Sequence, residues 1–137
     1  MNAYVLDTSV AVAWYLEEVF STSARAWQDR LLTGKVVLVV PSLHYWEFAN
    51  VLRTLFQLRE LQEDLAREIY ELHMDAPLEL GEPDQKSVLD VALRYGATAY
   101  DAVYISLCLS RDIPLITAEK TTTTWVTKLR NRIEPVR

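Results

Sequence analysis

Apolar residues occur along this chain either in short unbroken runs or in longer stretches that place them on one face of a helix. The runs at Tyr4-Val5-Leu6, Val36 to Val40 and Pro114 to Thr117 predict buried inner strands. The second of these has no polar position at all, which is typical of a strand covered on both faces in a parallel sheet. Leu78-Glu79-Leu80 predicts a short strand, and Ile133 to Val136 predicts an edge strand.

Helices are predicted between these runs, because apolar residues recur there at helical spacing and are bounded by capping residues, proline and glycine. The predicted helices cover residues 10–15, 21–32, 44–58, 63–74, 83–96 and 98–110. We expect the third and fourth of them to pack as a hairpin. Residues 119–129 remain open, because four consecutive threonines suit a loop or a strand as well as a helix.

Each predicted helix has an apolar side that should face the core. The residues expected on these buried sides include Leu32, Leu65, Ile69 and Leu72, and the helix that begins at Pro83 carries the apolar residues Leu89 and Leu93. The alternation of strands with helices predicts an α/β fold with three layers, α/β/α, and a mainly parallel sheet. We expect residues 1–137 to form a single domain, because no linker or repeat interrupts the pattern.

Composition agrees with a compact folded protein. Half of the 137 residues are hydrophobic, which is enough for a substantial core. The single cysteine, Cys108, excludes a disulfide framework and a cysteine-based zinc site, and we expect it in the core of a protein from the reducing cytoplasm. We expect no signal peptide and no membrane span.

The net charge of −5 and the pI near 5.0 argue against a protein that holds nucleic acid on a broad basic face. They do not exclude a nuclease whose acidic site reaches phosphates through metal ions. The basic residues gather near the end of the chain at Lys120, Lys128, Arg130, Arg132 and Arg137. We favour a solvated face for this tail over contact with a phosphate backbone.

Two carboxylates follow predicted inner strands. Asp7 comes directly after the first strand, and Glu119 follows the last inner strand as Thr117-Ala118-Glu119. In open α/β sheets, ligands bind at the carboxyl ends of the strands, so these acids stand where chemistry is expected. The alternative for Asp7 or Thr8 is that it caps the next helix.

Two further acids lie on predicted helices. Glu47 shares a helix face with Asn50 and Thr54 on an otherwise apolar helix, where a carboxylate needs a partner or a metal. Asp101 lies in the first turn of a nearly all-apolar helix, where its charge could simply complement the helix dipole. Each simple alternative holds for one acid, but four such acids together favour a shared site.

In order along the chain, four segments resemble the motifs of the PIN-domain nucleases. These are Val5-Leu6-Asp7-Thr8-Ser9, Pro41-Ser42-Leu43 with Glu47 and Asn50, Thr98-Ala99-Tyr100-Asp101-Ala102-Val103-Tyr104, and Leu115-Ile116-Thr117-Ala118-Glu119. The resemblance spans nearly the whole chain. The compact length and the central helical hairpin are similar to those of the VapC-type toxins of toxin–antitoxin pairs.

The resemblance implies a parallel sheet of four to five strands and an acidic pocket that binds Mg²⁺ or Mn²⁺ and hydrolyses RNA. It assigns the principal acidic roles to Asp7, Glu47 and Asp101, and it implies a homodimer and an antitoxin partner. Glu119 departs from the family pattern, which usually has aspartate there. Its longer side chain can still reach a metal, directly or through water.

This set of residues suits metal-dependent hydrolysis for a chemical reason. Hard divalent cations select oxygen ligands, and clustered carboxylates repel one another unless a cation neutralises them. We therefore expect Asp7, Glu47, Asp101 and Glu119 to bind the metal. We expect the hydroxyls of Ser9 and Thr117 and the amide of Asn50 to orient these acids without contacting the metal.

Other interpretations remain open. His44 and His73 lie on different predicted helices without ligand spacing, so we expect structural or surface roles for them. A PIN-like module that has lost activity could serve only as a binding partner, and Glu119 keeps this alternative open. A receiver-type phosphoacceptor domain is a less favoured alternative, because Val40-Pro41 offers no acceptor aspartate after a middle strand.

Overall fold

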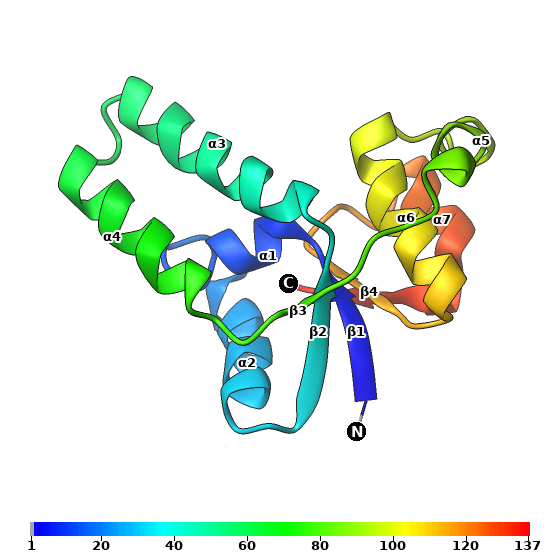
Figure 1. Ribbon diagram of the computed structural model, residues 1–137, viewed down its shortest axis with the longest axis horizontal. Helices are drawn as coiled ribbons and strands as arrows, with labels where there is room; N and C mark the ends of the chain where they lie inside the picture. Colours follow the sequence, from blue (N-terminus) through cyan, green and yellow to red (C-terminus); the bar gives the residue numbers. More distant parts are fainter. Residues whose placement is uncertain (1) are drawn as a thin grey trace.

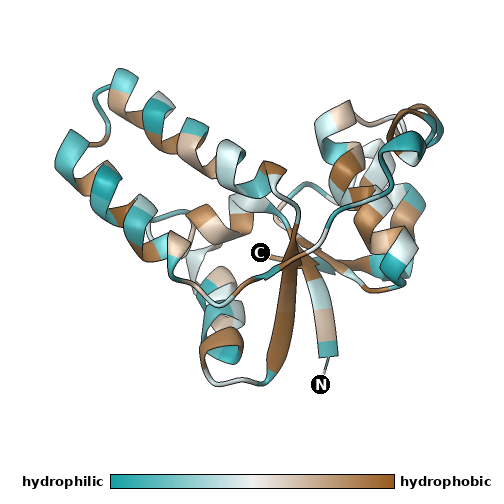
Figure 2. Ribbon diagram, viewed as in Figure 1, coloured by the Kyte–Doolittle hydropathy of each residue, from teal (hydrophilic) through white to brown (hydrophobic). Residues whose placement is uncertain are grey.

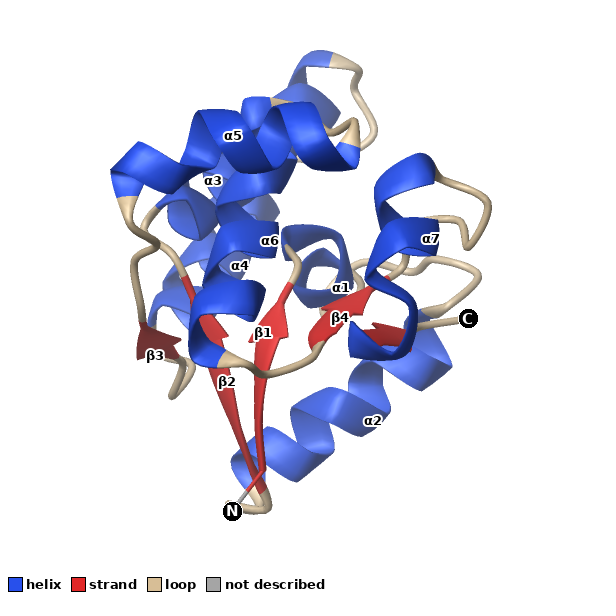
Figure 3. Cartoon of the chain, turned by 90° about the vertical axis from the view of Figure 1, so that its right-hand side faces the viewer, coloured by secondary structure: helices blue, strands red, loops and turns tan. Residues whose placement is uncertain are grey.

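The computed structural model describes residues 2–137, which form a five-stranded parallel sheet with helices on both faces (Figure 1). The strands are β1 (Asn2–Leu6), β2 (Val36–Val40), β3 (Glu79–Leu80), β4 (Leu115–Thr117) and β5 (Ile133–Pro135). Their order in the sheet is β3-β2-β1-β4-β5, with every neighbouring pair parallel. In Figure 3 the arrows of β1, β2 and β4 point the same way. The predicted three-layer α/β/α fold is confirmed.

The helices divide between the two faces of the sheet (Figure 1). Four of them, α1 (Thr8–Val12), α2 (Ser21–Leu32), α3 (Leu43–Gln57) and α4 (Glu63–Met74), contribute to one apolar cluster. The opposite cluster is formed by α5 (Gln85–Tyr95), α6 (Ala99–Arg111) and α7 (Thr124–Leu129), after which a 3₁₀ turn spans Arg130–Arg132. The predicted hairpin of α3 and α4 is present.

The inner strand β2 shows why the sheet is covered on both faces. Leu38 and Val40 point into the cluster of α1 to α4, whereas Val39 points into the cluster of α5 to α7. Figure 2 shows this strand as hydrophobic along its length. Cys108 is buried in the second cluster, where the sequence predicted a core residue.

Some predicted buried positions are wrong. Leu65 and Leu72 of α4 are exposed, because the buried face of this helix is centred on Ile69 and His73 and leaves both leucines at its edge. In α5, Val91 and Ala92 face the core, whereas Leu89 and Leu93 are exposed. Leu32, at the end of α2, is also exposed.

The ambiguous segment at residues 119–129 contains helix α7. Thr123 is its N-cap residue, and the buried side of the helix consists of Trp125, Val126 and Leu129. The hydroxyl of Thr127 donates to the carbonyl oxygens of Thr121 and Thr123, so a threonine here satisfies backbone groups at the helix start. In the part of the chain described by the structure, no helix is long and apolar enough to span a membrane.

The topology creates one switch point, between β1 and β4. The chain adds β2 and then β3 on one side of β1 and returns through α5 and α6 to place β4 on the other side. Val5 pairs with Leu115 and Leu6 with Ile116, so both strands end at the same edge. Ligands of open α/β sheets bind at such a point.

Candidate active site

Asp7 leaves the end of β1 with its side chain turned toward β4. It occupies the N-cap position of α1, but its carboxylate makes no capping hydrogen bond. Instead, Thr117 Oγ1 donates to Asp7 Oδ2 at 2.8 Å. The capping alternative therefore does not describe this side chain, which is held across the switch point of the sheet.

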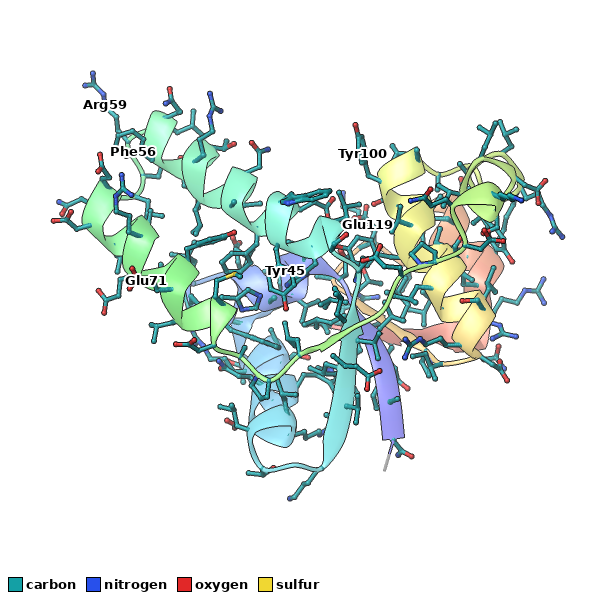
Figure 4. The ribbon with its side chains drawn as sticks, viewed as in Figure 1. Tyr45, Phe56, Arg59, Glu71, Tyr100 and Glu119 are labelled. Atoms are coloured by element: carbon teal, nitrogen blue, oxygen red, sulfur yellow. The ribbon has the colours of Figure 1, made fainter. Side chains whose placement is uncertain are left out.

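Thr117 also fixes the start of the segment that carries Glu119. This threonine is fully buried at the end of β4, and its Oγ1 accepts a hydrogen bond from the backbone N–H of Glu119 at 3.1 Å. The Glu119 carboxylate is exposed and accepts a long hydrogen bond of 3.4 Å from Thr123 Oγ1. In the view of Figure 4 it lies between α3 and α6.

Glu47 is held by two hydroxyl groups that come from other helices. Tyr104 Oη, from α6, donates to Glu47 Oε1 at 2.6 Å, and Thr8 Oγ1, from α1, donates to the same oxygen at 3.0 Å. The two hydroxyl oxygens are themselves 2.6 Å apart. The polar partner that the apolar face of α3 requires is thus a pair of buried hydroxyls.

Asp101 lies in the first turn of α6, three residues before Tyr104. Its backbone N–H donates to the Oγ1 of Thr98, the N-cap residue, at 3.1 Å. Burial raises the pKa of its carboxyl group, and the charges of Glu119 and Glu47 raise it further. A carboxylate that only complemented the helix dipole would have a lowered pKa, so burial, together with the neighbouring negative charges, outweighs the dipole here.

Asp7 has the largest shift among the acids. Burial is the main cause that raises its pKa from 3.8 to about 6, and the hydrogen bond from Thr117 opposes this shift. The neighbouring carboxylates raise the pKa further. These neighbours are Asp101, Glu47 and Glu119. Four acids separated along the sequence therefore share one electrostatic site.

Comparison with known families decides which class of protein this is. A family model described as PIN domain matches residues 4–121. The chain belongs to the PIN domain family. PIN domains are generally nucleases and typically use divalent metal ions. This membership rules out the receiver-type alternative. A comparison with curated protein sequences gives no match.

Solved structures share the fold of this PIN domain at low sequence identity. PAE2754 from Pyrobaculum aerophilum is 20% identical, with a TM-score of 0.75 over 96% of this chain and 83% of that chain. VapBC2 from Rickettsia felis, bound to a DNA fragment from their promoter, is 13% identical, with a TM-score of 0.67 over 98% and 99%. FitAcB from Neisseria gonorrhoeae is 15% identical, with a TM-score of 0.61 over 91% and 93%.

The fit of these acids to a metal ion depends on how the ion is bound. Within residues 2–137, no three acidic, histidine or cysteine side chains are close enough together to hold a metal as they stand. A hydrated Mg²⁺ does not require this, because it keeps several waters and takes one or two carboxylates directly. The salt bridges of the described residues lie elsewhere and leave these four acids without a cationic partner. The oxygen donors and the unneutralised charge therefore fit a hydrated divalent ion.

The three supporting residues predicted from the sequence differ in their placement. Thr117 contacts Asp7 and the backbone of Glu119, as described above. Ser9 and Asn50 are exposed, and among the described side chains neither makes a hydrogen bond to one of the four acids. Their predicted supporting roles stay predictions.

Sequence reasoning missed Thr8 and Tyr104, which hold Glu47. A signal for Tyr104 exists in hindsight, because it follows Asp101 by three residues and so lies on the same side of an apolar helix. It also missed that His44 and His73 meet. Both are fully buried, which agrees with a structural role, but their ring nitrogens are 2.8 Å apart.

Proposed function

We propose that this PIN domain is a divalent-metal-dependent endoribonuclease that hydrolyses RNA phosphodiester bonds. The observation that carries the proposal is the grouping of four carboxylates around the switch point: burial and the neighbouring negative charges raise the pKa of Asp7 and of Asp101, and no salt bridge among the described residues neutralises any of the four. Such a cluster of like charges is destabilising in itself, so binding of a cation is the simplest physical explanation for its presence. Family membership supports the same chemistry.

In this proposal Asp7, Glu47, Asp101 and Glu119 hold Mg²⁺ or Mn²⁺. A bound divalent ion supplies a water of lowered pKa and stabilises charge that develops on the phosphate. The protein's own contribution is orientation. Thr117 holds the carboxylate of Asp7, and Tyr104 holds that of Glu47, so both acids are fixed before substrate arrives.

Exposed aromatic residues support a single-stranded substrate. Trp46 precedes Glu47 and is 68% exposed, and Tyr100 precedes Asp101 and is 65% exposed. Figure 4 shows Tyr100 pointing outward from the start of α6. Unpaired bases stack on such side chains with little sequence preference.

The basic tail gives less support for RNA binding than its charge suggests. Arg132 pairs with Asp112 at 2.6 Å, and Lys128 Nζ donates to the carbonyl oxygen of Arg94 at 2.7 Å. These two cations are therefore engaged within the protein. Lys120 is exposed beside Glu119 and is the better placed of the tail residues to meet a phosphate.

We further propose that the protein acts as the toxin of a toxin–antitoxin pair, as a homodimer in which residues 1–137 form one domain. The similarity of its fold to VapBC2 and FitAcB supports this. An antitoxin segment could silence the site with an arginine or lysine, because a guanidinium or ammonium group can replace the charge of the metal among carboxylates.

Cleavage of an RNA panel tests the enzymatic proposal. The chelator-treated protein should be inactive, and added Mn²⁺ or Mg²⁺ should restore cleavage. Asp7→Asn should lose the activity, whereas Asp90→Asn, which removes a carboxylate from the exposed side of α5, should keep it. Metal-independent cleavage would overturn the proposal. RNA or partner binding without cleavage in either metal would instead favour the catalytically weakened binding module.

The toxin proposal has its own tests. Expression in a bacterial host should arrest growth, and coexpression with the product of a short adjacent reading frame should restore it. Asp7→Asn should abolish the arrest. Sedimentation at micromolar concentration should give a dimer, and a monomer would contradict that part. An active nuclease that causes no arrest would indicate general RNA processing.

A further inference from the structure

The two histidines of this chain, His44 on α3 and His73 on α4, form a buried pair within the helical hairpin. His44 Nε2 and His73 Nε2 are 2.8 Å apart, so one of these nitrogens carries a proton and the other accepts it. His73 Nδ1 lies 2.9 Å from Tyr15 Oη, and His44 Nδ1 lies 3.1 Å from Thr8 Oγ1. Both nitrogens of each ring therefore have a hydrogen-bonding partner. Burial lowers the pKa of both imidazoles, to about 3 for His44 and about 4 for His73, and keeps them neutral at pH 7.

The hydroxyl groups around Glu47 determine which nitrogen of each histidine carries the proton. Three oxygens form a triangle there, from Thr8 Oγ1, Tyr104 Oη and Glu47 Oε1, with sides of 2.6, 2.6 and 3.0 Å. Glu47 Oε1 accepts a hydrogen bond from each hydroxyl, so the single proton of Thr8 and the single proton of Tyr104 are both used at this oxygen. If Thr8 donated to His44 instead, a single proton would remain for these contacts, and two short oxygen pairs would face each other unbridged. The proton of Thr8 therefore lies on the carboxylate side.

This fixes every donor further along. Thr8 must accept from His44, so His44 carries its proton on Nδ1 and its Nε2 is an acceptor. His73 must then donate through Nε2–H, which leaves its Nδ1 to accept the hydroxyl proton of Tyr15. Burial raises the pKa of Tyr15 to about 12, so this phenol keeps its proton at neutral pH.

We infer that a one-way hydrogen-bond chain runs from Tyr15 to Glu47 through both histidines and positions the Glu47 carboxylate. Its members come from the segment after α1, from α4, α3 and α1 in turn, and it returns to α3 at Glu47, so directed bonds as well as packing join α1 and α4 to the helix that carries this acid. These are positioning residues, since they act through Thr8. The catalytic meaning of the chain rests on the proposed function, but its protonation pattern does not.

Long-range ¹H–¹⁵N NMR of histidine-labelled protein reads both tautomers directly. The parent should show His44 protonated on Nδ1 and His73 on Nε2. Thr8→Val keeps the shape but removes the acceptor, so both rings should reverse, with His44 donating to His73 and His73 donating to Tyr15. Thr8→Ser restores the hydroxyl and should restore the parental pattern. Tyr15→Phe should leave both tautomers unchanged, because the direction is set at the Glu47 end.

A parent with His44 protonated on Nε2 would overturn the inference, and so would a Thr8→Val protein with unchanged tautomers. If Thr8→Val does not fold, the parent, Thr8→Ser and Tyr15→Phe decide the question. In an active nuclease, Thr8→Val should lower the cleavage rate at saturating RNA on the order of tenfold to hundredfold, with recovery in Thr8→Ser. The assigned tautomers in a protein that cleaves no RNA would refute the nuclease alone, whereas reversed tautomers in an active nuclease would refute the chain alone.

Discussion

Replacing Asp7 by asparagine should stabilise the metal-free protein at neutral pH, although it removes one of the proposed metal ligands. The pKa of Asp7 is raised from 3.8 to about 6, chiefly by burial. A shift of roughly 2 units corresponds to about 3 kcal/mol, at ~1.4 kcal/mol per unit, by which the charged form disfavours folding. Asparagine avoids this cost, and its amide oxygen can still accept the hydrogen bond from Thr117.

The sign of the pH dependence follows from the direction of the shift. Because the pKa of Asp7 is higher in the folded state, protonation contributes stability that is fully present below pH 3.8 and is lost as the pH rises through about 6. Urea denaturation of the metal-free parent and Asp7→Asn proteins should therefore give a difference of about 3 kcal/mol at pH 8 that shrinks toward pH 4. In thermal scans the same difference corresponds to roughly 10 °C for a domain of this size.

Equal stability of the two proteins at pH 8 would refute this reasoning, and so would a difference that does not change with pH. Asp90→Asn provides the matched control, because its carboxylate is exposed on α5 beside Arg94. This variant should change the free energy of unfolding by less than about 0.5 kcal/mol at any pH tested.

Substitutions at three further positions probe the other acids and their support. Asp101→Asn should weaken Mn²⁺ binding in calorimetry while leaving the metal-free fold intact or more heat-stable, and unchanged binding would contradict its role. Glu119→Gln should slow RNA cleavage, whereas Glu119→Asp should keep or raise the rate; equal rates for Glu119→Gln and the parent would make this residue a bystander. Tyr104→Phe removes the 2.6 Å donor to Glu47 and should cost about 1 kcal/mol of stability and roughly tenfold in cleavage rate, measured by denaturation and by turnover at saturating RNA.

The fold was readable from the sequence where burial leaves little choice. The unbroken run of β2 must be covered on both sides, which predicts an inner strand of a parallel sheet, and Leu38 and Val39 indeed face opposite clusters. Which side of α4 is buried could not be predicted from the sequence, because leucines and a histidine compete for that side. The core takes His73, which has a buried partner in His44, and leaves Leu72 exposed.

The acids of the candidate site could be predicted from the sequence, but the groups that hold them could not. Asp7 and Glu119 can be identified from the local sequence, because each carboxylate follows a predicted inner strand. Tyr104 and Thr8 meet although 96 positions separate them, and the two histidines meet across 29 positions. No local pattern encodes such a meeting, because it depends on how α1, α3, α4 and α6 pack. Sequence reasoning therefore finds the charges but not the network that positions them.

The substitution of glutamate for the usual fourth aspartate fits the way Thr117 joins the two strand ends. One hydroxyl holds the side chain of Asp7 and the backbone of Glu119, so the path of the chain is fixed at both positions. Asp7 then points into a half-buried, crowded site, where a longer acid would lose the hydrogen bond from Thr117. The Glu119 carboxylate is exposed and held only by a 3.4 Å contact with Thr123, so an extra methylene meets no packed neighbour that would resist it. The length of the acidic side chain is therefore constrained at Asp7 and unconstrained at Glu119. The departure from the family pattern falls at the position where the structure tolerates it.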